Sequence, residues 1–343
     1  MAKSVKIGLV GCGFFGRNHL QSWLELASVG ADLVAVCDLD KSKAAAWGKE
    51  FGIAAYDDMD QMLQDADLDL VDIVTQVGSH RRLVEKALHS GTAAIVQKPF
   101  GLNLADCQEM ADLSERTGVF LAVHENFRFQ RSSRLIRTAL EDGRIGQPNW
   151  GRIAFRTGYD IFAGQPYLRD EKRFIITDLG SHVLDLARYF FGEVERLTAE
   201  TQTRLENVRG EDTATMLLRH TSGAVSVVEC TYASFQKPDP FPSTLIEIEG
   251  TKGGLHLGGD LILHISGPDG DTTTSTDVPV RAWAERPWHG VQESVYRTCE
   301  QILKSYQGNV AAETSASDNL KTYSLCEAAY TSAANSASVT LSS

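Results

Sequence analysis

The chain has 343 residues, a formal net charge of −12 and a sequence pI of about 5.2. A protein this acidic is a poor candidate for binding nucleic acid or anionic membranes, and no apolar run approaches the roughly 18 residues of a membrane helix. The N-terminus lacks a signal-peptide pattern, and the six cysteines are scattered without a Cys-x-x-Cys pair. We therefore expect a cytoplasmic protein of two domains, with reduced thiols and no disulfides or structural zinc.

A glycine motif typical of dinucleotide-binding proteins stands near the N-terminus. The run Gly11-Cys12-Gly13-Phe14-Phe15-Gly16 follows a strand predicted over Val5–Val10 and opens a helix predicted from Arg17 to Ala27. In this context the first glycine makes the turn, the second lets a pyrophosphate approach the backbone, and the third lets the helix pack on the strand. The motif therefore predicts cofactor contacts from Gly11, Gly13, Phe14, Phe15 and Gly16.

An acidic residue ends the next predicted strand, Asp32–Cys37. Asp38 lies 22 positions after Gly16, where a carboxylate binds the adenosine ribose hydroxyls. A 2′-phosphate would be repelled there, so Asp38 favours NAD. The neighbouring Lys41 and Lys43 keep NADP open as the less favoured cofactor.

Strands and helices alternate through the first third of the chain, which predicts an α/β fold with a doubly wound parallel sheet. Ligands of such a sheet bind at the carboxyl ends of its strands. We therefore expect further cofactor contacts from the residues at or just after those ends: Thr75, His80, Gln97, Lys98 and Asn126.

Lys98 follows a strand predicted over Ala93–Val96. A lysine beside a bound cofactor can donate to a substrate oxygen and stabilise developing negative charge on it. The alternative is a surface lysine before a turn-forming proline, and position alone does not separate the two.

The stretch Ile175–Asp185 places Asp178 and His182 four residues apart. If it is helical, both side chains lie on one face, one turn apart. An imidazole near a carboxylate is a usable general base. A capping or packing role for the histidine is the alternative.

The second half of the chain shows many alternating strands between Gly151 and Leu257, which predicts one broad, mostly antiparallel sheet. Residues Gly158–Phe174 are expected to form a long functional loop. Its Tyr159, Tyr167, Arg169 and Arg173 are candidate sugar-binding residues, and packing of the loop onto the sheet is the alternative for each. Arg128, which follows the last strand of the first half of the chain, is a further candidate. Metal binding is not expected, because the spacing of His80, His124 and Glu125 matches no ligand pattern.

The ordered set of motifs resembles the Gfo/Idh/MocA oxidoreductases: the glycine motif, Asp38, Lys98-Pro99, and Asp178-x-Gly180-x-His182. The resemblance implies a Rossmann domain, residues 1–125, and a substrate-binding and oligomerisation domain, residues 126–343, whose open sheet forms a homodimer or homotetramer. It implies NAD(P)-dependent oxidation of a sugar or polyol hydroxyl. It makes Lys98, Asp178 and His182 the catalytic residues, all three touching substrate, and suggests a cis Lys98–Pro99 bond.

Two departures from the family pattern concern the site. Gln97 stands where the family often has glutamate, and Arg173-Phe174 replaces a Gly-Gly pair, which implies a differently shaped substrate pocket. The stretch from Pro166 to Asp185 is most similar to D-apiose dehydrogenases within the family, which implies oxidation of an aldose at C1 to a lactone.

Three alternatives stay open at this stage. One is an inositol or other polyol dehydrogenase, and another is an enzyme that recycles NAD while it is bound. The third is a non-catalytic nucleotide-binding sensor, which would not need Lys98, Asp178 and His182 together.

Overall fold

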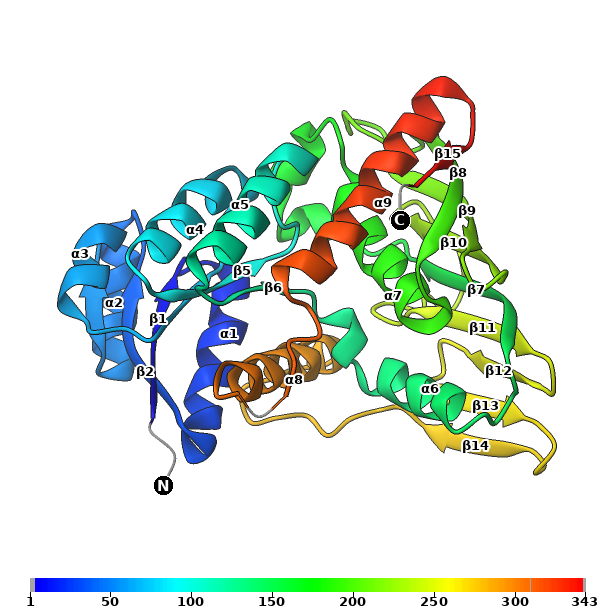
Figure 1. Ribbon diagram of the computed structural model, residues 1–343, viewed down its shortest axis with the longest axis horizontal. Coiled ribbons are helices and arrows are strands. Elements are labelled where there is room, and N and C mark those ends of the chain that lie inside the picture. Colours follow the sequence, from blue (N-terminus) through cyan, green and yellow to red (C-terminus); the bar gives the residue numbers. More distant parts are fainter. Residues whose placement is uncertain (1–3, 309, 342–343) are drawn as a thin grey trace. The chain divides into compact units, whose positions relative to one another are not determined.

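The computed structural model describes residues 4–308 and 310–341 (Figure 1). The chain divides into two compact units: unit 1 comprises Met1–Asn126 and Val295–Tyr323, and unit 2 comprises Phe127–Ser294 and Ser324–Ser343. The sequence predicts contiguous domains of residues 1–125 and 126–343, so the structure differs in placing Val295–Tyr323 with unit 1. The reason is apolar packing: Val295, Cys299 and Ile302 are buried in the core of unit 1.

Unit 1 is built on a six-stranded sheet with the order β3-β2-β1-β4-β5-β6, in which every pair of neighbouring strands is parallel. This confirms the predicted doubly wound parallel sheet. The three-residue edge strand β3 was not predicted, because it is too short to show alternation. The strands are β1 (Val5–Val10), β2 (Ala31–Cys37), β3 (Ala54–Tyr56), β4 (Leu70–Ile73), β5 (Ala93–Gln97) and β6 (Leu121–His124).

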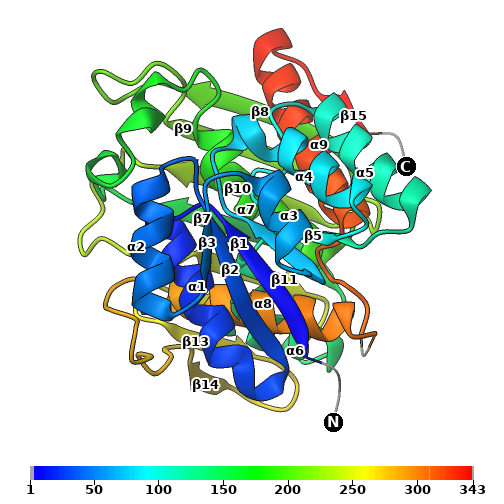
Figure 2. The same ribbon diagram turned by 90° about the vertical axis from the view of Figure 1, so that its left-hand side faces the viewer.

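Helices cover both faces of this sheet (Figures 1 and 2). One apolar core lies between the sheet and α1, α2 and the later turns of α8, and a second lies between the sheet and α3, α4 and α5. The helices are α1 (Phe14–Glu25), α2 (Lys41–Phe51), α3 (Met59–Asp65), α4 (His80–His89), α5 (Leu104–Thr117) and α8 (His289–Tyr306).

Unit 2 is built on a nine-stranded sheet with the order β14-β13-β12-β11-β7-β10-β9-β8-β15. Its described strand pairs are antiparallel except for β7 with β10, so the predicted mostly antiparallel sheet is confirmed. The strands are β7 (Pro148–Arg156), β8 (Val194–Gln202), β9 (Thr213–His220), β10 (Val225–Thr231), β11 (Leu245–Gly250), β12 (Gly254–Leu257), β13 (Ile262–Ser266), β14 (Thr272–Ser275) and β15 (Val339–Thr340).

One face of this sheet is covered by α6 (Arg131–Glu141), α7 (Ser181–Phe191) and the last turns of α9 (Ala316–Asn335), which share its apolar core. The expected loop Gly158–Phe174 contains two short 3₁₀ helices, Ile161–Ala163 and Pro166–Asp170. Within the part of the chain that is described, no helix is long and apolar enough to cross a membrane.

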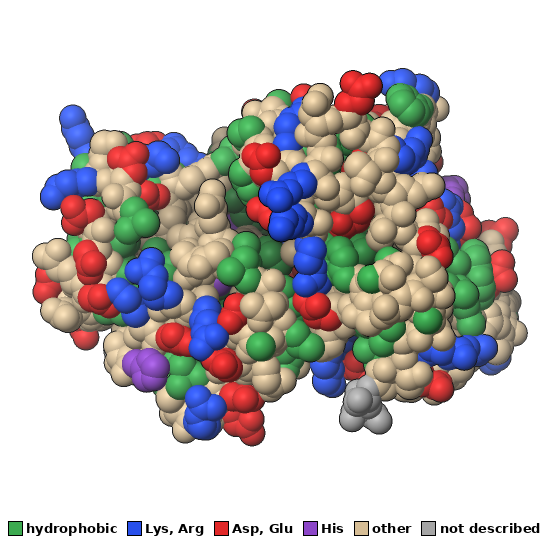
Figure 3. Space-filling model, turned by 90° about the horizontal axis from the view of Figure 1, so that it is seen from above, with side chains coloured by type: hydrophobic (Ala, Val, Ile, Leu, Met, Phe, Trp, Pro, Cys, Tyr) green, Lys and Arg blue, Asp and Glu red, His purple; other side chains and the backbone are tan. Residues whose placement is uncertain are grey.

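Charged side chains of both signs are mixed on the surface. On the face shown in Figure 3, Lys and Arg side chains lie among Asp and Glu side chains and do not form one continuous basic stripe.

Gly151 of β7 provides a stability test of the core of unit 2. A Cβ atom at this position would lie 2.4 Å from Phe191 Cζ and 2.8 Å from the carbonyl oxygen of Glu247. Gly151→Ala should therefore lower the free energy of unfolding by about 1–3 kcal/mol, measured by urea denaturation. Gly290→Ala is the matched control, because its Cβ would meet nothing within 4 Å. Equal stability of both variants would contradict this packing.

Candidate active site

The glycine motif has the geometry that a dinucleotide requires. Gly11 has a φ of +109°, and a Cβ there would lie 2.3 Å from the carbonyl oxygen of Val74. A Cβ on Gly16 would lie 2.2 Å from the carbonyl oxygen of Gly11, so the start of α1 packs directly on the turn. At Gly13, in contrast, a Cβ would meet nothing within 4 Å. The backbone is therefore open at the position where a pyrophosphate would approach the helix N-terminus.

Asp38 follows β2 and contacts the same turn. Its Oδ2 accepts a hydrogen bond from the backbone N–H of Cys12 at 2.7 Å, and its Oδ1 accepts one from the N–H of Asp40 at 2.8 Å. These contacts fix the carboxylate beside the glycine motif, where a ribose would lie. Lys41 is one of the two lysines that could bind the 2′-phosphate of NADP. Its Nζ lies 3.2 Å from Asp57 Oδ2, and its side chain is largely exposed.

The other predicted cofactor residues of unit 1 differ in exposure. Phe14 is 65% exposed at the start of α1, whereas Asn126 is buried. Phe15 packs edge-on against His19. The Thr75 hydroxyl lies 2.7 Å from the Ser79 hydroxyl in the loop after β4. Phe14 and Thr75 are accessible to a ligand, whereas Asn126 is not exposed in this structure.

His80 links two loops of unit 1. Its Nε2 lies 3.0 Å from the carbonyl oxygen of Thr75, and its Nδ1 lies 3.0 Å from the carbonyl oxygen of Pro99. Burial lowers the pKa of His80, which favours the neutral ring. A neutral imidazole carries one N–H, so His80 donates to one of these carbonyl oxygens and its other nitrogen only lies close to the second. The cofactor contact of His80 stays a prediction.

Gln97 and Lys98 lie at the carboxyl end of β5. The Gln97 side chain is buried, and its Oε1 accepts a hydrogen bond from the backbone N–H of Lys98 at 2.7 Å. The Lys98–Pro99 bond is cis, as expected. Lys98 is therefore not an unrestrained surface lysine, because side chains of unit 1 hold its own backbone and that of Pro99.

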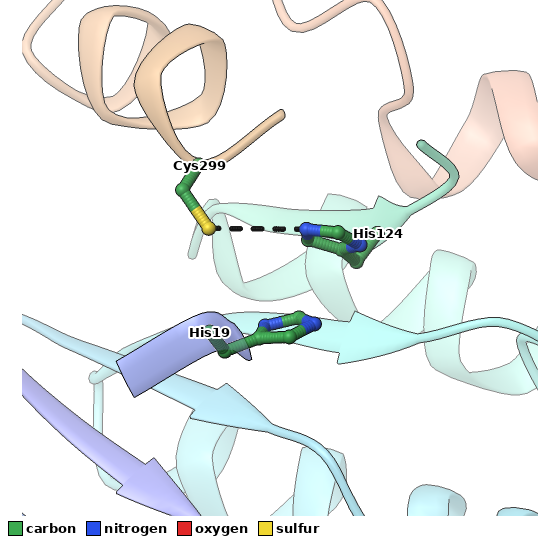
Figure 4. Close-up of side chains that lie close together, drawn as sticks. All are labelled: His19, His124 and Cys299. Atoms are coloured by element: carbon green, nitrogen blue, oxygen red, sulfur yellow. Dashed lines mark hydrogen bonds between the residues drawn. The ribbon is translucent and has the colours of Figure 1, made fainter. Parts of the chain in front are cut away.

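A cluster of His19, His124 and Cys299 lies beneath these loops, fully buried (Figure 4). Each offers one atom that could bind a metal, and the three atoms lie within 4.8 Å of one another. Both ring nitrogens of His19 are engaged, however: Nδ1 lies 2.8 Å from Asp72 Oδ2, and Nε2 lies 3.0 Å from Gln97 Nε2. A metal on His19 would have to break one of these contacts, so the geometry favours a hydrogen-bonded cluster.

Asp178 of unit 2 lies in a short π-helix, Ile176–Gly180, which leads into α7. The expected helix is therefore present, but its first turn is wider than an α-helix. π-Helical turns are frequent at functional sites. Partial burial, and then the Asp178 charge, raise the pKa of Tyr167 to about 12, and the Tyr167 hydroxyl donates to Gln165 Oε1 at 2.8 Å.

Tyr232 is a candidate that sequence analysis missed. It follows β10, 54 residues from Asp178, and its hydroxyl donates to Asp178 Oδ2 at 3.1 Å. Burial, and then the Asp178 charge, raise the pKa of Tyr232 well above its usual value, so the hydroxyl keeps its proton. Phe174 stacks on its ring at 5.8 Å between centroids. A buried tyrosine predicted on a strand carries no sequence signal of this contact.

His182 is the second residue of α7 and is 4% exposed. Its imidazole stacks on the ring of Phe127, with 3.8 Å between centroids and 6° between planes. This contact fixes the orientation of the ring. It does not involve the ring nitrogens, which lie in the imidazole plane.

Two predicted substrate-binding arginines have other partners in the structure. Arg128 is 6% exposed, and its Nε and Nη2 lie 2.5 and 2.7 Å from the carboxylate oxygens of Asp185. Arg173 lies 2.9 Å from Glu327 and stacks on the Tyr330 ring. Each cation is matched to an acid distant in sequence, which supports a structural role, and the substrate contact of each arginine stays a prediction.

Tyr159, a further candidate, is 37% exposed. It stacks on Phe241 at 4.0 Å between centroids, and the ring of Trp288 packs edge-on against both. Its packing against Phe241 and Trp288 supports the alternative role, yet its exposure leaves an aromatic face available to a sugar.

Comparisons with known proteins agree with these features. The model of the NAD-binding Rossmann fold of the GFO/IDH/MocA oxidoreductase family matches residues 5–125, and that of the family's C-terminal domain matches residues 133–256. D-apiose dehydrogenase of Paraburkholderia graminis is 47% identical over 99% of this chain and 91% of its own length. D-apiose dehydrogenase of Rhizobium rhizogenes is 44% identical over 98% and 97%.

Solved structures show the same architecture. An oxidoreductase from Agrobacterium radiobacter in complex with NAD+, L-tartaric acid and magnesium superposes with a TM-score of 0.96, at 43% identity and over 98% of both chains. Levoglucosan dehydrogenase in complex with NADH and levoglucosan has a TM-score of 0.86 at 21% identity, which shows the shared fold alone. The chain therefore belongs to the GFO/IDH/MocA family of NAD-binding oxidoreductases.

Proposed function

We propose that this chain is an NAD-dependent sugar dehydrogenase that oxidises D-apiose at C1 to the lactone. The observation that carries the proposal is the identity of 44–47% to two D-apiose dehydrogenases over nearly the whole chain. The open backbone at Gly13 and the carboxylate of Asp38 fit the pyrophosphate and ribose of NAD. When bound, the cofactor supplies the hydride acceptor.

In this proposal the side chains of the protein control the substrate oxygen and its proton. His182 accepts the proton of the reacting hydroxyl as general base, with its ring held by Phe127. Asp178 orients the imidazole and stabilises the positive charge that it acquires. Lys98 donates to the reacting oxygen and stabilises negative charge on it.

We further propose that the enzyme is a cytoplasmic homo-oligomer formed through the outer face of the nine-stranded sheet. On this face Trp150 pairs with Val225, and Val227 pairs with Leu217. Leu217 is 51% exposed and the other three are partly buried. The same face also carries the ion-paired Arg152, Glu229 and Glu247, so a subunit contact there would combine apolar and charged side chains. Measurement of the molar mass in solution tests this contact.

The substrate proposal predicts the outcome of a panel assay. With NAD, D-apiose should give a kcat/KM at least about tenfold above that of other aldoses and of myo-inositol, measured by NADH absorbance. Myo-inositol is included because myo-inositol 2-dehydrogenase of Thermotoga maritima is 29% identical over 73% of the chain. A preference for myo-inositol would favour a polyol dehydrogenase. Tight binding of NAD without turnover of any substrate in the panel would favour a non-catalytic sensor.

The assigned roles predict that Lys98→Met and His182→Ala each lower kcat by about 100-fold or more. The dissociation constant of NAD should change little, because in this mechanism both side chains act on the substrate oxygen and its proton. Lys252→Met and His264→Ala are matched controls at exposed positions. Full turnover in either active-site variant would overturn the role of that residue.

Tyr232→Phe should lower kcat by about tenfold and shift the acidic limb of the kcat/KM profile to higher pH. The carboxylate of Asp178 would lose a hydrogen bond that stabilises its charged form, so it would protonate more readily. An acidic limb at the wild-type position would show that Tyr232 does not act on Asp178.

Asp38→Ala should reduce the preference for NAD over NADP, since the carboxylate that would repel a 2′-phosphate is removed. The ratio of kcat/KM values for the two cofactors measures this preference. An unchanged ratio would argue against the contact of Asp38 with the ribose.

A further inference from the structure

The side chain of Gln97 joins the backbone of Lys98 to the imidazole of His19. Its Oε1 lies 2.7 Å from the backbone nitrogen of Lys98, and its Nε2 lies 3.0 Å from His19 Nε2. The backbone N–H can only donate, so the oxygen of the amide must face Lys98. The amide N–H₂ then faces His19 and donates, and His19 Nε2 must be the accepting nitrogen.

This assignment determines the other side of the ring. A neutral imidazole that accepts at Nε2 carries its proton on Nδ1, and His19 Nδ1 lies 2.8 Å from Asp72 Oδ2. The same oxygen accepts a hydrogen bond from Trp23 Nε1 at 2.7 Å. A continuous chain of hydrogen bonds therefore runs from the carboxylate of Asp72 to the backbone of Lys98.

The position of Asp72 indicates that this series of hydrogen bonds is not an accident of packing. It lies in β4, between Leu9 of β1 and Ile95 of β5, and its side chain is fully buried. Within the described part of the chain, its Oδ1 has no hydrogen-bond partner. A buried carboxylate is costly unless donors compensate it, so an apolar residue would be the simpler choice in the core of a sheet.

We propose that Asp72, His19 and Gln97 form a positioning relay that holds Lys98 for catalysis. The inference rests on the proposed function, in which Lys98 donates to the reacting oxygen. The relay holds the backbone N–H of Lys98, and His80 holds the carbonyl of the next residue, Pro99. Gln97 is then a positioning residue and not the cofactor contact that its sequence position predicts.

The amide at position 97 also sets the charge of His19. A glutamate there would place a second carboxylate on the imidazole, opposite Asp72, and would favour the doubly protonated ring. The other ionisable groups at this cluster are His124, whose ring lies 4.1 Å from that of His19, and Cys299. Burial raises the pKa of the Cys299 thiol well above its usual value, so it stays neutral. The glutamine thus leaves His19 Nε2 as an acceptor, with Asp72 as the one carboxylate on the ring.

The test compares Gln97→Met with Gln97→Glu in the full-length protein. Gln97→Met removes both contacts, and we expect kcat for the best sugar to fall by about tenfold or more, with the dissociation constant of NAD within about twofold. Gln97→Glu keeps an oxygen for the Lys98 N–H, so it should recover most of the loss. Wild-type kcat in Gln97→Met, or an equal loss in both variants, would overturn the relay.

A spectroscopic measurement tests the same relay without turnover. In ¹⁵N-histidine NMR, the wild-type protein should show His19 as the neutral Nδ1–H form, assigned with His19→Gln, and Gln97→Glu should convert it to the imidazolium. The ¹³C signal of methylated Lys98 should shift in Gln97→Met and return towards wild type in Gln97→Glu. A charged His19 in the wild type, or a Lys98 signal that does not change, would overturn the relay. Failure of the protein to oxidise any sugar would refute the proposed function alone.

Discussion

The buried carboxylate of Asp72 is the constraint on which the architecture around Lys98 depends. It lies on a central strand of a parallel sheet, where apolar side chains are the rule. Its hydrogen bonds to His19 and Trp23 connect the sheet to α1, the helix that begins at the glycine motif. The same carboxylate, through Gln97, reaches the residue that we assign to the substrate oxygen. The turn of the glycine motif and the backbone of Lys98 are thereby fixed to the same core of unit 1.

In unit 2, too, buried neighbours hold the side chains that we assign to catalysis. Asp178 lies in a π-helical turn, where the regular α-helical hydrogen bonds are shifted, and Tyr232 donates to its carboxylate from the end of β10. His182 is held by stacking on Phe127. In both units a proposed catalytic side chain is positioned by a buried neighbour that takes no part in the chemistry. Preorganisation of this kind is what electrostatic and general-base catalysis require.

Local patterns in the sequence were sufficient to predict the fold class and to locate the site motifs. The parallel sheet followed from alternating strands and helices, and the cofactor turn followed from the glycine motif and Asp38, because these features depend on neighbours along the chain. The ion pair of Arg128 with Asp185 and the hydrogen bond of Tyr232 to Asp178 were not predicted, because the partners lie 57 and 54 residues away. Such pairs form only when strands and helices pack, and single-sequence periodicity contains no information about them.

The proposed reaction transfers a hydride from C1 of an aldose to NAD, and isotope transfer tests it most directly. D-apiose carrying deuterium at C1 should react with NAD more slowly than the unlabelled sugar, and the reduced nicotinamide should contain the deuterium. The sugar product should be the lactone. Reduced cofactor without deuterium, or a product oxidised at another carbon, would contradict the proposed reaction.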